Sequence, residues 1–167
     1  MKKLTKLLLV NWHYFQNTVI DFGDINFLTG KNSAGKSTII DALQVVLMGE
    51  TRSAAFNRAA SKKSERTLKS YLIGSMGEDI ENGNKSLRDG KDFSTYIVAE
   101  FYDDFKSAYF CLGAVFDTFA DGSDINKRFF WLKNNIPTNR FIENGKTMDS
   151  RRMTLFFKEK YPNKFET

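Results

Sequence analysis

A glycine-rich segment between residues 30 and 37 constrains the fold of this chain more than any other feature. The segment reads GKNSAGKS and fits the pattern G-x-x-x-x-G-K-[ST] at each fixed position, namely Gly30, Gly35, Lys36 and Ser37. A short apolar run over residues 25–29 precedes it and predicts a strand. Apolar residues then recur at helical spacing and predict a helix over 37–48, which Gly49 ends. A strand, a loop of this kind and a helix in this order predict an α/β fold with a phosphate-binding loop.

The residue types in this loop suit the binding of a nucleoside triphosphate. Gly30 and Gly35 allow the tight turns that aim successive N–H groups at an anion, beside a helix N-terminus that also attracts negative charge. Lys36 is expected to reach the β- and γ-phosphates, and the Ser37 hydroxyl to ligate Mg²⁺. The alternative is a glycine turn that arose by chance, which the predicted strand and helix on either side argue against. The predicted ligand is ATP with Mg²⁺, held by Gly30, Lys31, Asn32, Ser33, Ala34, Gly35, Lys36, Ser37 and Thr38.

Length, composition and cysteine content narrow the class of protein. The chain has 167 residues, of which 41% are hydrophobic, so we expect one globular unit with its own core. Its apolar runs are far shorter than the roughly 20 residues that a membrane-spanning helix needs. Cys111 and His13 are the only cysteine and histidine, which excludes an intrachain disulfide and a zinc site of Cys and His ligands. We therefore expect a cytoplasmic protein that does not enter a membrane.

The rest of the chain predicts a mainly antiparallel sheet. Apolar or alternating runs bounded by turn residues predict strands over 4–12, 18–22, 93–102, 107–118, 127–133 and 140–143. A short helix is predicted over 65–73, and a last helix, capped by Asp149 or Ser150, runs to Phe157. Residues 50–64 have the composition of a surface loop, and four glycines within 74–92 predict a mobile loop.

Together these elements predict a single lobe over residues 1–167. Its predicted parts are the first strands, phosphate loop and helix (1–49), the basic loop, short helix and mobile loop (50–92), the antiparallel strands (93–145) and a C-terminal helix (149–160). The predicted architecture is a P-loop NTPase with a mixed sheet around the loop helix and an antiparallel β subdomain.

Positive charge is concentrated locally within the net charge of +5. Residues 51–70 carry six basic and one acidic side chain, whereas 71–126 carry four basic and eleven acidic ones. A basic stretch attracts nucleic acid by displacing counterions from phosphates, but charged runs also occur as ordinary solvated surface. Both interpretations remain open at this point.

A complete ATPase also needs a carboxylate at the end of an apolar strand and a group that orients the attacking water. The nearest candidates are Asp103 and Asp104, which follow the predicted strand 93–102. That strand contains Glu100 and predicts a half-exposed hairpin rather than a buried parallel strand. Asp41 lies a helical turn beyond Ser37, so we expect it to be a surface or supporting carboxylate and not a metal ligand. No catalytic residue is predicted within this chain.

Three segments resemble the beginning of the SMC-like, ABC-type ATPases. They read LLVNWHYF over 8–15, IDF over 20–22 and INFLTGKNSAGKSTIIDAL over 25–43. FNRAA over 56–60 and RTLKSYLIG over 66–74 are similar to the JetC/MukB-like group, which includes a subunit of the Wadjet plasmid-defence system. The resemblance covers residues 4–74 well and the remainder loosely.

This resemblance implies the N-terminal lobe of an ATPase head whose last helix leads toward a coiled coil. In that family a C-terminal head lobe carries the magnesium-binding acid (Walker B), the catalytic glutamate and the signature motif, so this chain would be an ATPase only when completed by it. Two such heads enclose ATP as a dimer, work with accessory kleisin-type subunits, and move or extrude DNA in chromosome segregation or plasmid defence. The resemblance also implies that Arg52 and Arg58 lie near DNA. Lys62 and Lys63 are candidates for additional phosphate contacts.

Two details of the resemblance stay open. Gln16 and Gln44 are the only glutamines, and neither follows the antiparallel strands where such heads place a magnesium-contacting glutamine. Asn11, Trp12 and Phe15 either flank the adenine or belong to the core.

Two further functions are compatible with the sequence. An OLD- or RecF-like DNA-repair ATPase lobe shares the head fold. A self-contained small P-loop kinase would use Asp103 or Asp104 to hold the metal and the 74–92 segment as a lid.

Overall fold

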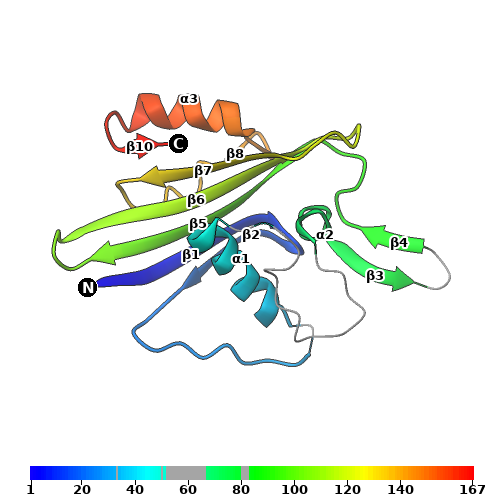
Figure 1. Cartoon of the computed structure of the whole chain (residues 1–167), viewed down its shortest axis with the longest axis horizontal. Coiled ribbons are helices and arrows are strands. Elements are labelled where there is room, and N and C mark those ends of the chain that lie inside the picture. Colours follow the sequence, from blue (N-terminus) through cyan, green and yellow to red (C-terminus); the bar gives the residue numbers. More distant parts are fainter. Residues whose placement is uncertain (33, 50, 52–66, 80–82) are drawn as a thin grey trace.

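A six-stranded antiparallel sheet forms the centre of the protein (Figure 1). The computed structural model describes residues 1–32, 34–49, 51, 67–79 and 83–167. The strands are ordered β10-β7-β6-β5-β1-β2. Their bounds are β1 Lys2–Trp12, β2 Phe15–Asp21, β5 Phe93–Asp103, β6 Ala108–Thr118, β7 Asn126–Leu132 and β10 Phe165–Glu166. The strands predicted in these regions are confirmed to within a few residues, while β10 is an additional strand.

The neighbouring strands β1 and β5 are buried on both faces of the sheet. Leu7, Leu8, Leu9 and Val10 are completely inaccessible, and so are five consecutive residues of β5, 95–99. The prediction of a half-exposed strand at 93–102 is therefore wrong, because both faces of β5 are covered. Even Glu100 is 1% exposed, and its carboxylate accepts hydrogen bonds from the Thr5 hydroxyl and the Ile136 N–H, both at 2.8 Å. These donors offset the cost of burying a polar group.

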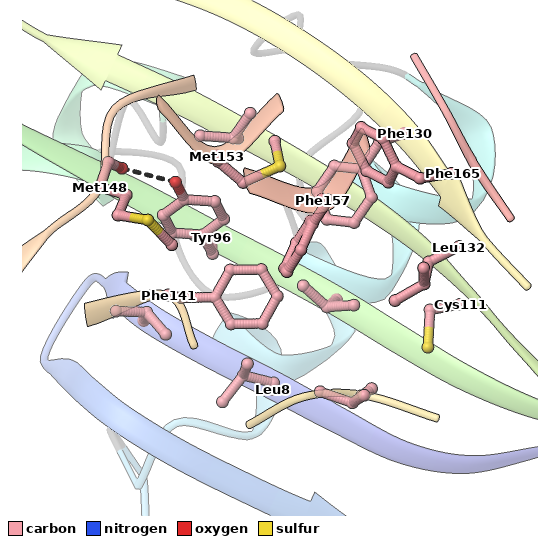
Figure 2. Close-up of a cluster of buried hydrophobic side chains, with 14 residues drawn as sticks. Leu8, Tyr96, Cys111, Phe130, Leu132, Phe141, Met148, Met153, Phe157 and Phe165 are labelled. Atoms are coloured by element: carbon pink, nitrogen blue, oxygen red, sulfur yellow. Dashed lines mark hydrogen bonds between the residues drawn. The ribbon is translucent and has the colours of Figure 1, made fainter. Parts of the chain in front are cut away.

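Alternate residues of the sheet build two cores on its opposite faces. On one face, Leu7 and Leu9 pack with residues of α1 (Lys36–Met48) and α2 (Leu68–Ile73). On the other face, Leu8 and Val10 pack with residues of α3 (Ser150–Lys160). Figure 2 shows this second core, in which Phe157 lies among the rings of Phe130, Phe141 and Phe165. None of the helices in the described residues is long and apolar enough to cross a membrane.

The start of α3 is fixed by two aspartates. Asp149 is the N-cap residue, and its carboxylate accepts the N–H of Arg152 at 2.7 Å. The buried carboxylate of Asp117 accepts three hydrogen bonds, from the Ser94 hydroxyl, the Asn126 amide and the Ser150 N–H. The predicted cap at Asp149 is confirmed, and the helix ends at Lys160, three residues beyond Phe157.

Two short hairpins complete the described elements. One pairs β3 (Ser75–Asp79) with β4 (Gly83–Ser86), and the other pairs β8 (Ile142–Glu143) with β9 (Lys146–Thr147). The prediction of a mobile loop over 74–92 is therefore wrong where β3 and β4 form a hairpin. The β3–β4 hairpin forms through backbone pairing. Its sequence lacks the alternating apolar residues from which a strand is predicted, so the sequence did not indicate it.

The strand predicted over 25–29 is not formed. Residues 22–30 have no regular secondary structure, and the side chains of Ile25 and Phe27 are 79% and 84% exposed. A strand requires neighbours that accept and donate its backbone hydrogen bonds. In the described part of the chain no strand pairs with this segment. Without a strand at 25–29, the predicted mixed sheet around the loop helix does not form among the described residues. Every described strand pairing is antiparallel.

Candidate functional site

The phosphate-binding loop has the backbone geometry that its glycines predict. Gly30 and Gly35 have φ values of +148° and +91°, which side-chain-bearing residues rarely adopt. The ammonium of Lys36 crosses the loop and donates to the carbonyls of Gly30 at 2.6 Å and Lys31 at 2.8 Å. An ammonium has three N–H donors, so one remains for a further acceptor. The loop therefore forms a closed ring with a positive charge across it.

The N-terminus of α1 lies directly after this ring and is open to an anion. Its N-cap is Gly35, which has no side chain to accept a hydrogen bond from the first turn. No acidic residue lies in that turn either. The first N–H groups of a helix lack partners within the helix, and the helix dipole adds positive potential there. Ser37 lies partly exposed in this turn, as a ligand for a nucleotide-bound Mg²⁺ requires.

The remaining residues of the predicted site lie around the ring. Lys31, Asn32 and Ala34 are exposed, whereas Ser33 lies outside the described residues. Thr38 is only 8% exposed, and its carbonyl accepts a hydrogen bond from the indole N–H of Trp12 at 2.9 Å. The fold thus brings together the described residues of the predicted site, with Thr38 on the buried side.

Trp12 and Tyr71 connect the loop helix to α2. Their rings stack with centroids 4.5 Å apart, and both side chains are buried. The Tyr71 hydroxyl donates to the carboxylate of Asp41, which is completely inaccessible. The expectation of a surface position for Asp41 is therefore wrong, because Tyr71 gives that carboxylate a buried partner. Of the two interpretations of Trp12, its burial and stacking favour the core over an adenine contact.

The turn between β1 and β2 is held by groups from distant parts of the sequence. The N–H of His13 donates to the Tyr71 carbonyl at 2.8 Å. The guanidinium of Arg88 donates to the His13 carbonyl and, at 2.9 Å, to the Leu72 carbonyl. Arg88 is 9% exposed, and burial lowers its pKa to about 10, so it still carries its charge at neutral pH. Sequence reasoning missed Arg88 because it lies within the segment expected to be a mobile loop.

Tyr14, within this turn, packs directly against the phosphate-binding loop. A Cβ added to Gly35 would lie 1.7 Å from the Tyr14 hydroxyl oxygen and 2.9 Å from Cζ of the same ring. The hydroxyl is buried and has no hydrogen-bond partner among the described residues. Burial also raises the pKa of Tyr14. No sequence signal marks this residue, because its contact with Gly35 joins positions 21 residues apart.

The acidic residues proposed as metal ligands lie at the far end of the sheet. The register of β1 with β5 pairs Lys2 with Asp103, while Trp12, at the other end of β1, contacts the loop helix. The 11 residues of β1 span roughly 33 Å at about 3.3 Å per residue. Asp103 instead accepts backbone N–H groups in the β5–β6 turn, and Asp104 pairs with the N-terminal amine. This distance excludes both as ligands of a metal held at the loop.

The four predicted DNA-contact residues have no structural description. Arg52, Arg58, Lys62 and Lys63, the candidates for DNA contact, lie outside the described residues. Asn11 and Phe15 belong to the β1–β2 hairpin. The Asn11 amide donates to the Ser94 carbonyl at 3.1 Å, and Phe15 packs against the core beneath α1. Their role at an adenine stays a prediction.

A comparison with protein families agrees with this geometry. Residues 4–63 match the family described as the P-loop containing region of AAA domain. The matched residues include most of β1 and all of β2, the phosphate-binding loop and α1. No curated protein matches the chain. Residues 4–63 are thus similar to the P-loop region of P-loop NTPases, a class that binds nucleotides and generally uses Mg²⁺.

Proposed function

We propose that this chain is the ATP-binding N-terminal lobe of an SMC-like ATPase head. A C-terminal head lobe completes its nucleotide site, and the assembled ATPase moves or extrudes DNA. The observation that carries this proposal is a phosphate-binding loop formed at the start of α1 while the segment before it stays unpaired. In this proposal the chain supplies the phosphate-binding half of the nucleotide site, and the C-terminal head lobe supplies the other half.

Exposed apolar side chains support a second lobe on this side of the molecule. Ile25, Phe27 and Leu28 are 79%, 84% and 41% exposed just before the loop. The helix that follows exposes three more large apolar residues, Ile40, Leu47 and Met48. Large exposed apolar side chains are typical of an interaction surface. A sheet that pairs with residues 25–29 and covers the outer side of α1 would bury both groups, as strands in parallel sheets are buried on both faces.

The distribution of acidic groups also supports an incomplete catalytic site. Asp103 and Asp104 are roughly a strand length from the loop, as shown above, and Asp41 is engaged by Tyr71. In the proposed function the second lobe contributes the magnesium-binding acid and the catalytic glutamate. The chain by itself would then bind ATP with Mg²⁺ through Lys36 and Ser37 but turn it over slowly.

The wider assembly belongs to the same proposal. Two heads would enclose the nucleotides as a dimer, kleisin-type subunits would join them, and Arg52 and Arg58 would contact DNA. Support for DNA contact comes from the six basic residues within 51–70 and from the resemblance of residues 4–74 to SMC-like heads. Chromosome segregation and plasmid defence are both compatible with such a machine.

Nucleotide binding is tested by calorimetry with ATP and Mg²⁺. Lys36→Ala removes the ammonium across the loop and should weaken ATP binding by about 10- to 150-fold, the usual worth of a hydrogen bond to a charged group. Lys133→Ala is the matched control, since Lys133 lies at the end of β7 and pairs with Glu166 at 3.1 Å. Equal ATP affinity in the wild type and Lys36→Ala would refute the assignment of the loop.

The incomplete-site proposal is tested by steady-state hydrolysis. The chain alone should hydrolyse ATP very slowly, and rapid turnover or phosphoryl transfer would contradict the proposal. DNA contact is tested separately, by the salt dependence of DNA affinity in Arg52→Glu and Arg58→Glu. Loss of affinity and a shallower salt dependence are expected if these residues contact phosphates.

A further inference from the structure

The hydroxyl of Tyr14 is a buried donor without a partner, located at the phosphate-binding loop. Its oxygen lies against the Cα of Gly35, the residue that ends the ring and begins the loop helix. Among the described residues no atom hydrogen-bonds to it. Buried hydroxyls nearly always have a partner, and leaving one unsatisfied is costly. An unsatisfied donor at a binding loop is therefore a candidate to donate to a bound ligand.

The hydroxyl cannot easily reach another partner, because the turn that carries it is held in place. Backbone bonds from His13 to Tyr71 and from Arg88 to His13 hold the turn on one side. On the other side, Phe15 pairs with Trp12 across the hairpin, and its ring lies 4.5 Å from that of Tyr14. Rotating Tyr14 away would also leave the space beside Gly35 empty. The acceptor must therefore come to the hydroxyl.

The groups around Tyr14 define the chemistry of that acceptor. The N–H groups at the start of α1 and the remaining N–H of Lys36 both favour an oxygen-rich anion. A phenol hydroxyl is a good donor to such an anion, and burial raises the pKa of Tyr14, which keeps the donor proton in place. Phosphate oxygens are acceptors that suit each of these three donors.

We infer that Tyr14 is a phosphate-contacting residue whose hydroxyl donates a hydrogen bond to the phosphate chain of the nucleotide bound at the loop. This inference rests on the proposed function and adds a phosphate-contacting residue that lies outside the sequence motif. In the empty protein the hydroxyl destabilises the fold, and in the bound state it contributes to affinity. Its removal should therefore change stability and affinity in opposite directions.

The test compares Tyr14→Phe with wild type in two measurements. Calorimetry with Mg²⁺ should show ATP and inorganic tripolyphosphate both binding about tenfold more weakly, as for a lost hydrogen bond to a charged group. Thermal unfolding without ligand should show an equal or higher midpoint, because an unsatisfied buried hydroxyl is removed. Tyr109→Phe is the matched control, since Tyr109 is half-exposed at the far end of the sheet. Tyr109→Phe should change neither the affinity for ATP nor the affinity for tripolyphosphate.

Each contrary result identifies a different error. Unchanged ATP affinity in Tyr14→Phe, with loss of binding in Lys36→Ala, would refute the Tyr14 contact and leave the proposed function standing. Weaker ATP binding with unchanged tripolyphosphate binding would place the contact elsewhere on the nucleotide and overturn the inference. A lower unfolding midpoint in Tyr14→Phe would show that the hydroxyl already has a partner. Unchanged binding in Lys36→Ala as well would refute the proposed function itself.

Discussion

The contact between Gly35 and Tyr14 makes a quantitative prediction about Gly35→Ala. Two costs add in this variant. Alanine at a φ of +91° costs about 1–2 kcal/mol from backbone strain alone. Its methyl group would also meet the Tyr14 hydroxyl oxygen at 1.7 Å, which forces the ring or the loop to move. Overpacking of this kind costs about 1–3 kcal/mol, so Gly35→Ala should destabilise the fold by about 2–5 kcal/mol in total.

A second glycine separates these two costs. Gly49 has a φ of +65° at the C-terminal end of the same helix, and nothing lies within 4 Å of a Cβ added there. Gly49→Ala therefore carries only the strain cost of about 1–2 kcal/mol. The gain from restricting the unfolded chain is about the same in both variants and cancels in the comparison. Gly35→Ala should exceed Gly49→Ala by about 1–3 kcal/mol.

Tyr14→Phe provides the second half of the measurement. It removes the oxygen at 1.7 Å and leaves Cζ at 2.9 Å as the nearest atom of the ring. Most of the extra cost of Gly35→Ala should therefore disappear in the Tyr14→Phe background, as a double-mutant cycle of urea unfolding curves would measure. Equal costs for Gly35→Ala and Gly49→Ala, or additive effects in the cycle, would show that Tyr14 does not pack on Gly35.

Three other predictions concern the core. Burial raises the pKa of Cys111 above its usual value of 9.0, so above pH 9 the unfolded state releases this proton before the folded state does. The contribution of Cys111 to the free energy of unfolding should be fully present below pH 9 and fall above it by about 1.4 kcal/mol per pH unit. In urea titrations the free energy of unfolding of Cys111→Ala should therefore fall less steeply with pH. Trp12→Phe loses the hydrogen bond to Thr38 and should cost about 1–2 kcal/mol and weaken ATP binding in calorimetry; an unchanged unfolding midpoint would contradict this. Asp117→Ala leaves the buried Ser94 hydroxyl and Ser150 N–H without their acceptor and also removes the part-buried bond from Asn126, so it should cost about 3 kcal/mol. Asp121→Ala, in an exposed turn, should leave thermal unfolding nearly unchanged.

Local sequence was sufficient for the elements whose cause is local. The fixed residues of the loop, the spacing of apolar residues after it and the cap at Asp149 predicted the loop, α1 and the start of α3. The long strands were likewise predicted from their apolar runs. In each case the residues that determine the element lie within it or next to it.

The misses have a different physical origin. Residues 25–29 have a strand-like composition, but a strand also needs partners, and the described residues provide none. Burial of Asp41 depends on Tyr71, and the position of Tyr14 depends on a turn fastened by Arg88. These contacts join residues 30 and 75 positions apart, which no local pattern reports.

The unpaired segment before the loop also has a thermodynamic consequence. Gly30 closes the ring that Lys36 spans, and it directly follows the residues that would pair with a partner sheet. A partner that orders those residues thereby removes part of the ordering cost that nucleotide binding would otherwise include. Linkage then requires the effect to be mutual: whatever factor the partner adds to nucleotide affinity, bound nucleotide adds to the affinity for the partner. In such an arrangement nucleotide occupancy and assembly report on each other.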